Sequence, residues 1–470
     1  MLKKLAILLF LCIIMSVFSS CGKAVENLGV DNTQVEDKQS IDLKGYNFKY
    51  YQTKTLGYTE DTLFADLAMQ RVADVEEKLN CKIEFIEGDF STELTNSLAV
   101  SSVLCDAGTY ESFALQPQIR AGSFLPISAI ESIVDFKNKP EKWGNKNQLS
   151  SLVWDNELYG VLPMYYPEFF YNACDFAFFV NEDIVKSLNQ PDPRELVENG
   201  QWNRAKLEEL MKLYTHTDTG GETVYGLGLF ISHFFDMALR TSGIEYAVKE
   251  KDAWVSGLHT QKALEVLTWA QDLLFTKGKD WTLTNFTYNA INSFVDGKTT
   301  MLLTHVGFGL ATVDTSDYKS ISFNMENFGI LPFPLSEDMP ANEWIGQHET
   351  MHNCVLFPAN IENPETAAYI VDALYEPLPG YETNEQRMDY YMRYIFHDTR
   401  DADIIFKMLD NCRYTYYKDG ARDIVDAMSN AKGTKTVTEI LESNKSKYQE
   451  VLEKVIIPSY ESIEHIWGTN

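Results

Sequence analysis

The strongest constraint on the fold is an alternation of strand-like and helix-like segments near the start of the ordered chain. Residues 46–53 alternate and are rich in aromatic side chains, as expected of a first strand, and residues 61–79 carry apolar side chains at helical spacing. Residues 81–86 alternate again, a short helix is expected over 94–103, and a third strand is expected to end at 106–110. This order predicts a mostly parallel sheet with helices on its faces. In such sheets, ligands bind beyond the carboxyl ends of the strands.

The length of the chain predicts two lobes rather than one. Ordered sequence is expected to begin near Leu43, which leaves roughly 420 residues, more than one hydrophobic core usually holds. Helices are predicted toward the carboxyl end, where residues 437–452 have apolar positions on one helical face.

The amino terminus has the pattern of a secretory signal. Lys3 and Lys4 precede an apolar run over 5–17 that, at about a dozen residues, is too short to span a bilayer. The run ends at Phe18-Ser19-Ser20-Cys21-Gly22, which resembles the lipobox of bacterial lipoproteins, although Phe18 stands where Leu is usual. The resemblance implies that residues 1–20 are removed and that Cys21 is lipidated, which anchors the chain at the extracytoplasmic face of the cell membrane. A plain secretory signal with a nearby cysteine is the alternative.

Residues 21–42 are polar and without periodicity, so we expect a disordered tether. The formal charge of the chain is −28, and loss of two lysines with the signal makes the mature chain more acidic still. Such a charge disfavours binding to nucleic acid, which needs clustered Lys and Arg. It also repels anionic lipid, so the predicted contact with the membrane is the lipid anchor.

The cysteines do not indicate a disulfide framework. Five remain after the signal and Cys21 are set aside, an odd number without CxxC spacing, and most are expected to be buried thiols. These are Cys81, Cys105, Cys174, Cys354 and Cys412.

A series of short motifs, in order along the mature chain, resembles the family 1 extracellular solute-binding proteins of ABC importers. Each motif is weak by itself, because Gly and Pro punctuate many folds, but seven or eight in the correct order are specific. They are the helix-to-strand turn at 79–85, Gly122-Ser123-Phe124-Leu125-Pro126, Tyr159-Gly160-Val161-Leu162-Pro163, Val180-Asn181-Glu182-Asp183-Ile184, the two-part motif Pro193-Arg194-Glu195-Leu196 with Gly200-Gln201-Trp202-Asn203, Phe294-Val295-Asp296-Gly297-Lys298, Phe328-Gly329-Ile330-Leu331-Pro332 and Asn363-Pro364-Glu365.

The resemblance implies a periplasmic-binding-protein-like fold of type II, with two α/β lobes joined by chain crossings. By analogy, residues 43–170 and 350–405 form lobe 1, and residues 171–349 and 406–470 form lobe 2. It also implies a monomeric, non-enzymatic protein without a cofactor, which binds a small solute between closing lobes and delivers it to an ABC permease. Sugar or oligosaccharide is the solute class that the resemblance favours.

Six residues are candidates for contact with the solute, because sugar sites combine aromatic faces with polar side chains. They occupy the end of the third strand, the first crossing, a loop before a helix, and a position where relatives often carry a stacking Trp. The candidates are Tyr110, Tyr165, Tyr166, Asp175, His233 and Phe308.

One motif favours a different class of protein. His348-Glu349-Thr350-Met351-His352 matches HExxH, which on a helix binds zinc through both His while Glu acts as a general base. Gly346 lies just before it, and residues 353–358 resemble a strand, so the context for a zinc peptidase is poor. A glycosidase stays open as a third class, because its two carboxylates are defined by a separation that sequence spacing cannot reveal.

Overall fold

The computed structural model describes residues 41–52, 65–111, 115–166, 176–251, 253–285, 287–311, 314–348, 353–414 and 420–468. By its internal contacts, the chain divides into Met1–Ile41 and a compact unit, Asp42–Asn470. The predicted signal, Cys21 and nearly all of the predicted tether lie outside the described residues. The start of ordered sequence near Leu43 stays a prediction, and all that follows concerns the compact unit.

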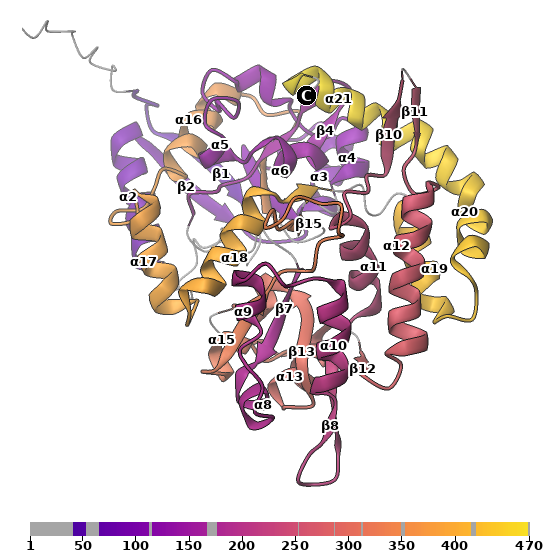
Figure 1. Cartoon of the computed structure of the whole chain (residues 1–470). Coiled ribbons are helices and arrows are strands. Elements are labelled where there is room, and N and C mark those ends of the chain that lie inside the picture. Colours follow the sequence, from indigo (N-terminus) through magenta and orange to yellow (C-terminus); the bar gives the residue numbers. More distant parts are fainter. Residues whose placement is uncertain are drawn as a thin grey trace, which may run out of the picture. The chain divides into compact units, whose positions relative to one another are not determined.

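The first sheet has five strands in the order β2-β1-β3-β16-β6 (Figure 1). Strands β1 (Tyr46–Tyr51), β2 (Cys81–Ile86) and β3 (Ala107–Glu111) are parallel, as the alternation of segments predicts. Strand β16 (Asn353–Leu356) returns from a distant part of the chain and runs antiparallel to β3 and to β6 (Gly160–Val161). The sheet is therefore mixed.

Helices α2 (Ala65–Leu79) and α16 (Pro364–Leu374) pack against each other beside this sheet. The helix predicted over 94–103 is α3 (Phe90–Ala99), four residues earlier than expected. The earlier start has a physical cause, because Asp89 accepts a hydrogen bond from the Thr92 amide and caps the helix. Phe90 is then buried against Tyr51, with ring centroids 5.0 Å apart.

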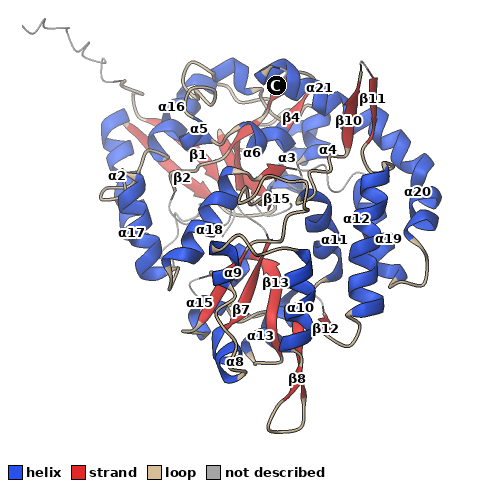
Figure 2. Ribbon diagram, viewed as in Figure 1, coloured by secondary structure: helices blue, strands red, loops and turns tan. Residues whose placement is uncertain are grey.

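The second sheet has the order β12-β9-β13-β7-β14, with β8 (His216–Thr217) paired to β9. Strands β12 (Thr282–Thr284), β9 (Thr223–Leu229) and β13 (Thr299–His305) are parallel. Strand β7 (Phe176–Asn181) runs antiparallel to both of its neighbours, β13 and β14 (Phe328–Leu331), so β14 has the same direction as the three parallel strands. Figure 2 shows the two sheets as separate groups of strands. The prediction of mostly parallel sheets is confirmed, and along each of the two strand orders one strand, β16 or β7, runs against its neighbours.

Many helices follow β7 along the chain as far as its carboxyl end, and several of them pack around the second sheet. They include α8 (Glu182–Ser187), α9 (Arg194–Glu198), α10 (Arg204–Tyr214), α11 (Ile231–Arg240), α12 (Gln261–Asp272), α13 (Thr287–Val295), α14 (Val306–Gly309), α15 (Ile321–Asn324), α17 (Asn384–Tyr394), α18 (Thr399–Asp410), α19 (Arg422–Ala431), α20 (Val437–Val451) and α21 (Ile457–Trp467). A hairpin of β10 (Ala247–Glu250) and β11 (Ala253–Ser256) lies beside them.

Smaller elements complete the part of the chain that precedes the first crossing. They are α4 (Gln116–Arg120), α5 (Pro140–Trp143), α6 (Lys146–Leu149), β4 (Val153–Trp154) and β5 (Glu157–Leu158), with short 3₁₀ turns over Ile127–Ile130 and Ser150–Leu152. Between the two sheets, β15 (Gln347–His348) pairs in parallel with β17 (Arg413–Tyr414).

Two helices lie where the predicted lobe boundaries do not put them. Helix α18 packs on β14 of the second sheet, although residues 399–405 are assigned to lobe 1 by analogy. Helix α21 packs beside β4 and β5, although residues 457–467 are assigned to lobe 2. In α21, Ser462 accepts a hydrogen bond from the Asn156 amide at 3.0 Å. The division of the chain into lobes, including the assignment of these two helices, stays a prediction.

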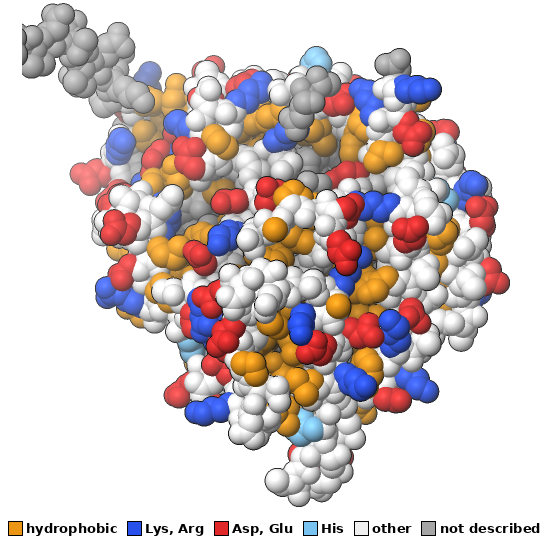
Figure 3. All heavy atoms as spheres, in the orientation of Figure 1, with side chains coloured by type: hydrophobic (Ala, Val, Ile, Leu, Met, Phe, Trp, Pro, Cys, Tyr) orange, Lys and Arg blue, Asp and Glu red, His pale blue; other side chains and the backbone are white. Residues whose placement is uncertain are grey.

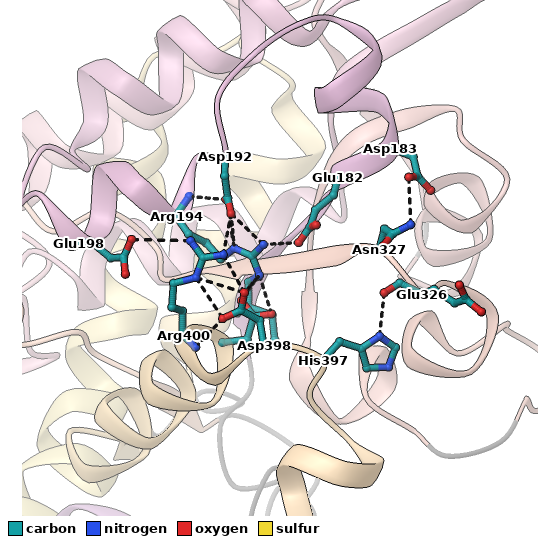
Figure 4. Close-up of polar contacts among 12 residues, drawn as sticks. Glu182, Asp183, Asp192, Arg194, Glu198, Glu326, Asn327, His397, Asp398 and Arg400 are labelled. Atoms are coloured by element: carbon teal, nitrogen blue, oxygen red, sulfur yellow. Dashed lines mark hydrogen bonds and ion pairs between the residues drawn. The ribbon is translucent and has the colours of Figure 1, made fainter.

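A buried ion cluster fixes α18 to the second sheet (Figure 4). Arg194, at the first position of α9, forms ion pairs with Glu182, Asp192, Asp398 and Asp401. Asp401, on α18, is fully buried and also accepts a hydrogen bond from the Ile330 amide of β14 at 2.8 Å. One guanidinium therefore joins α8, α9, α18 and β14.

Cys81, Cys105, Cys354 and Cys412 are free and buried, which confirms the prediction of buried thiols for these four. Cys174 lies outside the described residues. None of the described helices combines the length and apolar character that a membrane crossing requires. On the face seen in Figure 3, Lys and Arg side chains lie between Asp and Glu side chains, so the negative charge is spread over that face.

Candidate functional site

The carboxyl ends of the parallel strands in the second sheet meet at one edge. The register aligns Thr284 of β12, Leu229 of β9 and Leu303 of β13, and each strand is followed by a helix. Strand β7 runs the other way, so its first residue, Phe176, lies opposite His305, the last residue of β13. Strands β7 and β13 and the helices α11, α13 and α14 therefore bring aromatic or imidazole rings to this edge.

These rings form what we call the aromatic cluster. At its base, His233 of α11 and His305 flank Phe176, with ring centroids 4.3 and 4.4 Å from that of Phe176 and 5.0 Å from each other. All three residues are buried. The members of the aromatic cluster are Phe176, Phe230, His233, Tyr288, His305, Phe308 and Tyr318.

The other four rings are half-buried and keep part of their faces accessible. Phe308 lies 4.8 Å from His305, 5.5 Å from Tyr288 and 5.2 Å from Tyr318, and Tyr288 and Tyr318 are stacked. Burial raises the pKa of the Tyr318 hydroxyl to about 12, so that group is a neutral hydrogen-bond donor at physiological pH. Apolar ring faces with a few polar atoms between them suit a hydroxylated solute that has one apolar face.

The predicted residues His233, on α11, and Phe308, on α14, are thus brought together through His305, whose ring contacts both. Sequence reasoning missed His305, Tyr288 and Tyr318. The signal that could have found His305 is its place as the last residue of an apolar strand, three residues before the predicted Phe308.

Arg422 is a further residue that sequence reasoning missed. It is the first residue of α19, and its guanidinium donates to Ser232 Oγ at 2.9 Å and to Asp236 Oδ2 at 3.4 Å, both on α11. Asp236 is fully buried, and burial raises the pKa of its carboxyl to about 7 although Arg422 and Arg240 oppose the shift. Arg422 therefore contacts the first turns of α11, which also carry His233.

The first sheet offers polar groups at its own carboxyl edge. Tyr110, in β3, is half-buried against Phe90 at 5.6 Å, so the structure places this predicted residue at the edge where ligands bind. Gln52 directly follows β1 and is 3% exposed, and Gln116, which begins α4, is 8% exposed. Within the described chain, Gln52 Oε1 and both amide atoms of Gln116 have no hydrogen-bond partner. Buried amides without partners are costly, which makes these two candidates for contact with a polar solute.

The remaining predicted residues are not tied to the aromatic cluster by any contact among the described residues. The Tyr165 hydroxyl donates to Glu141 Oε1 at 3.3 Å, and its ring lies under Arg387 at 5.1 Å. Glu141 and Arg387 line a separate cavity of about 520 Å³ between α5, α6, α17 and α18. Tyr166 is buried, and Asp175 lies outside the described residues. The ligand-binding roles of all six candidates stay predictions.

The HExxH segment does not begin on a helix. Gln347–His348 is strand β15 and Asn353–Leu356 is strand β16, while 349–352 lie outside the described residues. A helix is what places both histidines of such a motif on one face, so the described part of the segment lacks the geometry of a zinc peptidase. Within the described ranges, no group of three or more His, Cys, Asp or Glu is arranged to hold a metal ion.

No protein-family model matches the chain, and no curated protein sequence matches it. Solved structures do match its fold. A cyclo/maltodextrin-binding protein in complex with maltotetraose is 14% identical, with a TM-score of 0.61 over 88% of this chain and 98% of that one. A sugar transporter protein from Rhizobium etli in an open conformation is 14% identical, with a TM-score of 0.59 over 87% of this chain and 100% of that one.

An ABC substrate-binding protein from Listeria monocytogenes in complex with cycloalternan is 12% identical, with a TM-score of 0.56 over 87% of this chain and 99% of that one. At such low identities these likenesses concern the fold alone. The chain has the two-lobe α/β fold of sugar-binding proteins of ABC transporters.

Proposed function

We propose that this protein is an extracytoplasmic solute-binding lipoprotein that captures a carbohydrate between its two lobes and delivers it to an ABC permease. The observation that carries the proposal is the aromatic cluster, because it lies at the carboxyl edge of a sheet in a fold that known sugar-binding proteins share. Half-buried ring faces stack on the apolar faces of sugar rings, and imidazole and phenol groups exchange hydrogen bonds with hydroxyls.

The charges around the cluster favour a neutral solute. Arg422 is balanced by Asp236 on α11 and by Asp426 on its own helix, so its charge is already compensated. On the first sheet, Gln52 and Gln116 offer amide groups rather than charges. A hydroxyl-rich neutral glycan uses such groups well, whereas a zwitterionic peptide would need charged partners.

In the proposed mechanism the protein performs no chemistry. Solute binding shifts the population toward a closed form, because contacts from both lobes are complete only when the lobes meet on the solute. The closed form then docks on the permease.

The first test is a thermal-shift screen of the chain from Gly22 onward, which lacks only the predicted signal and Cys21. The panel holds maltotriose, maltotetraose, other oligosaccharides, peptides and Zn²⁺ with chelator controls. A glycan present at a hundred times its dissociation constant is expected to stabilise the fold by about 2.7 kcal/mol. A shift with Zn²⁺ alone, abolished in His348→Ala, would contradict the proposal and favour the peptidase.

A second prediction concerns the anchor. In cells, Cys21→Ser is expected to abolish incorporation of labelled palmitate and to move the protein from the membrane fraction to the soluble fraction, because one thiol carries the acyl groups. Cys12→Ser is the matched control, since Cys12 lies in the apolar run of the signal and should leave labelling unchanged. Membrane retention of the Cys21→Ser protein would refute lipidation at this position.

A further inference from the structure

Arg422 connects α19 to the beginning of α11. With described residues, its guanidinium makes these polar contacts: Nη2 donates to Ser232 Oγ at 2.9 Å, Nη1 lies 3.4 Å from Asp236 Oδ2, and Nε lies 2.6 Å from Asp426 Oδ1. The first two partners precede Arg422 by 190 and 186 positions in the sequence. The contact is therefore a tertiary link between two helices, and the third partner anchors the guanidinium to its own helix.

The two acceptors on α11 lie on either side of His233 in the sequence. Ser232 and Asp236 are four residues apart, so they share one face of the helix, and both are buried. His233 follows Ser232 directly and is directed to a neighbouring face, where its ring contacts Phe176, Phe230 and His305. Arg422 holds one face of the first turns, and the aromatic cluster lies against the other.

A link of this kind fixes the rotation of α11 about its own axis. Because Ser232 Oγ and Asp236 Oδ2 are one helical turn apart, a guanidinium that reaches both cannot stay in place if the helix turns. Any turn of the helix would swing the His233 ring relative to Phe176 and His305. The planar fork of Arg suits this role, whereas Lys offers a single point of attachment.

We propose that Arg422 is a positioning residue of the solute site, which sets the orientation of the His233 ring by holding the first turns of α11. The effect of this role on solute binding rests on the proposed function. There, the orientation of the imidazole at the base of the aromatic cluster sets how the solute stacks. The orientation itself does not depend on which solute binds.

Asp236 makes the link sensitive to the loss of Arg422. Its carboxyl is fully buried, and the charged groups that face it are Arg422 and Asp426 on α19 and Arg240 on its own helix. Burial raises its pKa to about 7, and the two arginines oppose that shift. Without Arg422 one of the two opposing charges is gone, so the pKa of this carboxyl would rise further and no charge on α19 would attract it.

The experiment uses the chain from Gly22 onward with ¹³C-labelled histidine rings, so that each imidazole gives its own NMR signal. His233→Gln identifies the His233 signal by its disappearance. Arg422→Met and the milder Ser232→Ala are both expected to displace the His233 signal, with Arg422→Lys intermediate. Ser242→Ala is the matched control, since Ser242 is also a buried acceptor of an arginine, Arg204, but at the far end of α11.

In the same variants, maltotetraose serves as the binding probe. If the wild-type protein binds it, Arg422→Met is expected to weaken binding about tenfold, equivalent to 1.4 kcal/mol, with partial recovery in Arg422→Lys. An unchanged His233 signal in a folded Arg422→Met protein would overturn the positioning role. If that variant does not fold, Ser232→Ala decides, because an unchanged signal there has the same meaning.

The two proposals can fail separately. Absence of any glycan shift in the wild-type protein counts against the proposed function, while the NMR signals still test the orientation of His233. A displaced His233 signal with unchanged affinity for a glycan that binds would overturn the part of the inference that concerns the solute site.

Discussion

Replacing Arg194 by Met is expected to lower the free energy of unfolding by about 3–5 kcal/mol, because removing one partner leaves buried charges uncompensated. The Arg194 side chain is 3% exposed, and Asp401 beside it is fully buried. Their N–O distance is 3.0 Å. Water can solvate the charges of an exposed ion pair of this protein when the pair is broken. It cannot do so here, because both side chains are buried.

The pH dependence of this loss has a definite sign. Burial raises the pKa of Asp401 to about 7, above its unfolded value of about 3.9, so the native state holds this proton more tightly than the unfolded state. Asp401 therefore contributes stability that is present below the unfolded pKa and is lost as the pH rises through the folded pKa. Without Arg194 its folded pKa would rise further, so the destabilisation is expected to be larger at pH 8 than at pH 5.5.

Urea unfolding of the wild-type and Arg194→Met proteins at both pH values measures the effect. Arg393→Met is the matched control, because Arg393 forms an exposed pair with Asp389 on α17, and such pairs contribute about 0–1 kcal/mol. Adding Asp401→Asn to Arg194→Met should recover part of the lost stability, since the buried charge is then gone. Equal losses in Arg194→Met and Arg393→Met would show that the ion cluster of Figure 4 does not hold α18 in place.

Local sequence signals were enough to predict the first three strands of the first sheet. Residues 46–53 and 81–86 alternate, and they form β1 and β2, as expected of strands with one more exposed face; residues 106–110 were predicted to end a strand and contain most of β3, whose positions 107–109 are buried. The start of α3 was placed four residues late because the prediction followed apolar spacing, whereas the helix begins at the Asp89 cap.

Contacts between distant segments could not be predicted in this way. Strand β16 lies 242 residues or more beyond β3, and nothing in its apolar pattern indicates that it runs antiparallel to its neighbour. The position of α21 could not be predicted either. It packs beside β4 and β5, where Ser462 accepts a hydrogen bond from the Asn156 amide. A hydrophobic period of 2 residues indicates a strand and one of 3.6 residues indicates a helix, but neither indicates which other element packs against it.

For the candidate site, a residue could be predicted where its position matched the family pattern, and could not be predicted elsewhere. His233 and Phe308 were predicted from their places in that pattern, and the structure brings both to His305. Arg422, in contrast, is one of many charged residues near the carboxyl end, and its role is defined by partners far away in the sequence. Gln52 is a candidate because its side chain is buried, and no local sequence pattern indicates that burial.

Replacing Phe308 by Ala is expected to weaken binding of the glycan with the largest thermal shift by roughly 30-fold, about 2 kcal/mol, which is typical of an aromatic anchor in a binding site. Phe308 is half-buried and contacts His305, Tyr288 and Tyr318, so its removal eliminates one stacking face and loosens three neighbours. Isothermal titration calorimetry of the folded variant measures the loss directly.

Two further variants separate stacking from general effects of removing a phenyl ring. Phe323→Ala is the matched control, because Phe323 is 62% exposed on α15 and lies outside the aromatic cluster, so its affinity should equal that of the wild-type protein. Phe308→Trp keeps a stacking face and adds an indole N–H, and it is expected to bind at least as tightly as the wild-type protein. If Phe308→Ala binds the glycan as well as Phe323→Ala does, the solute does not stack on this ring, and the aromatic cluster is part of the hydrophobic core instead of the binding surface.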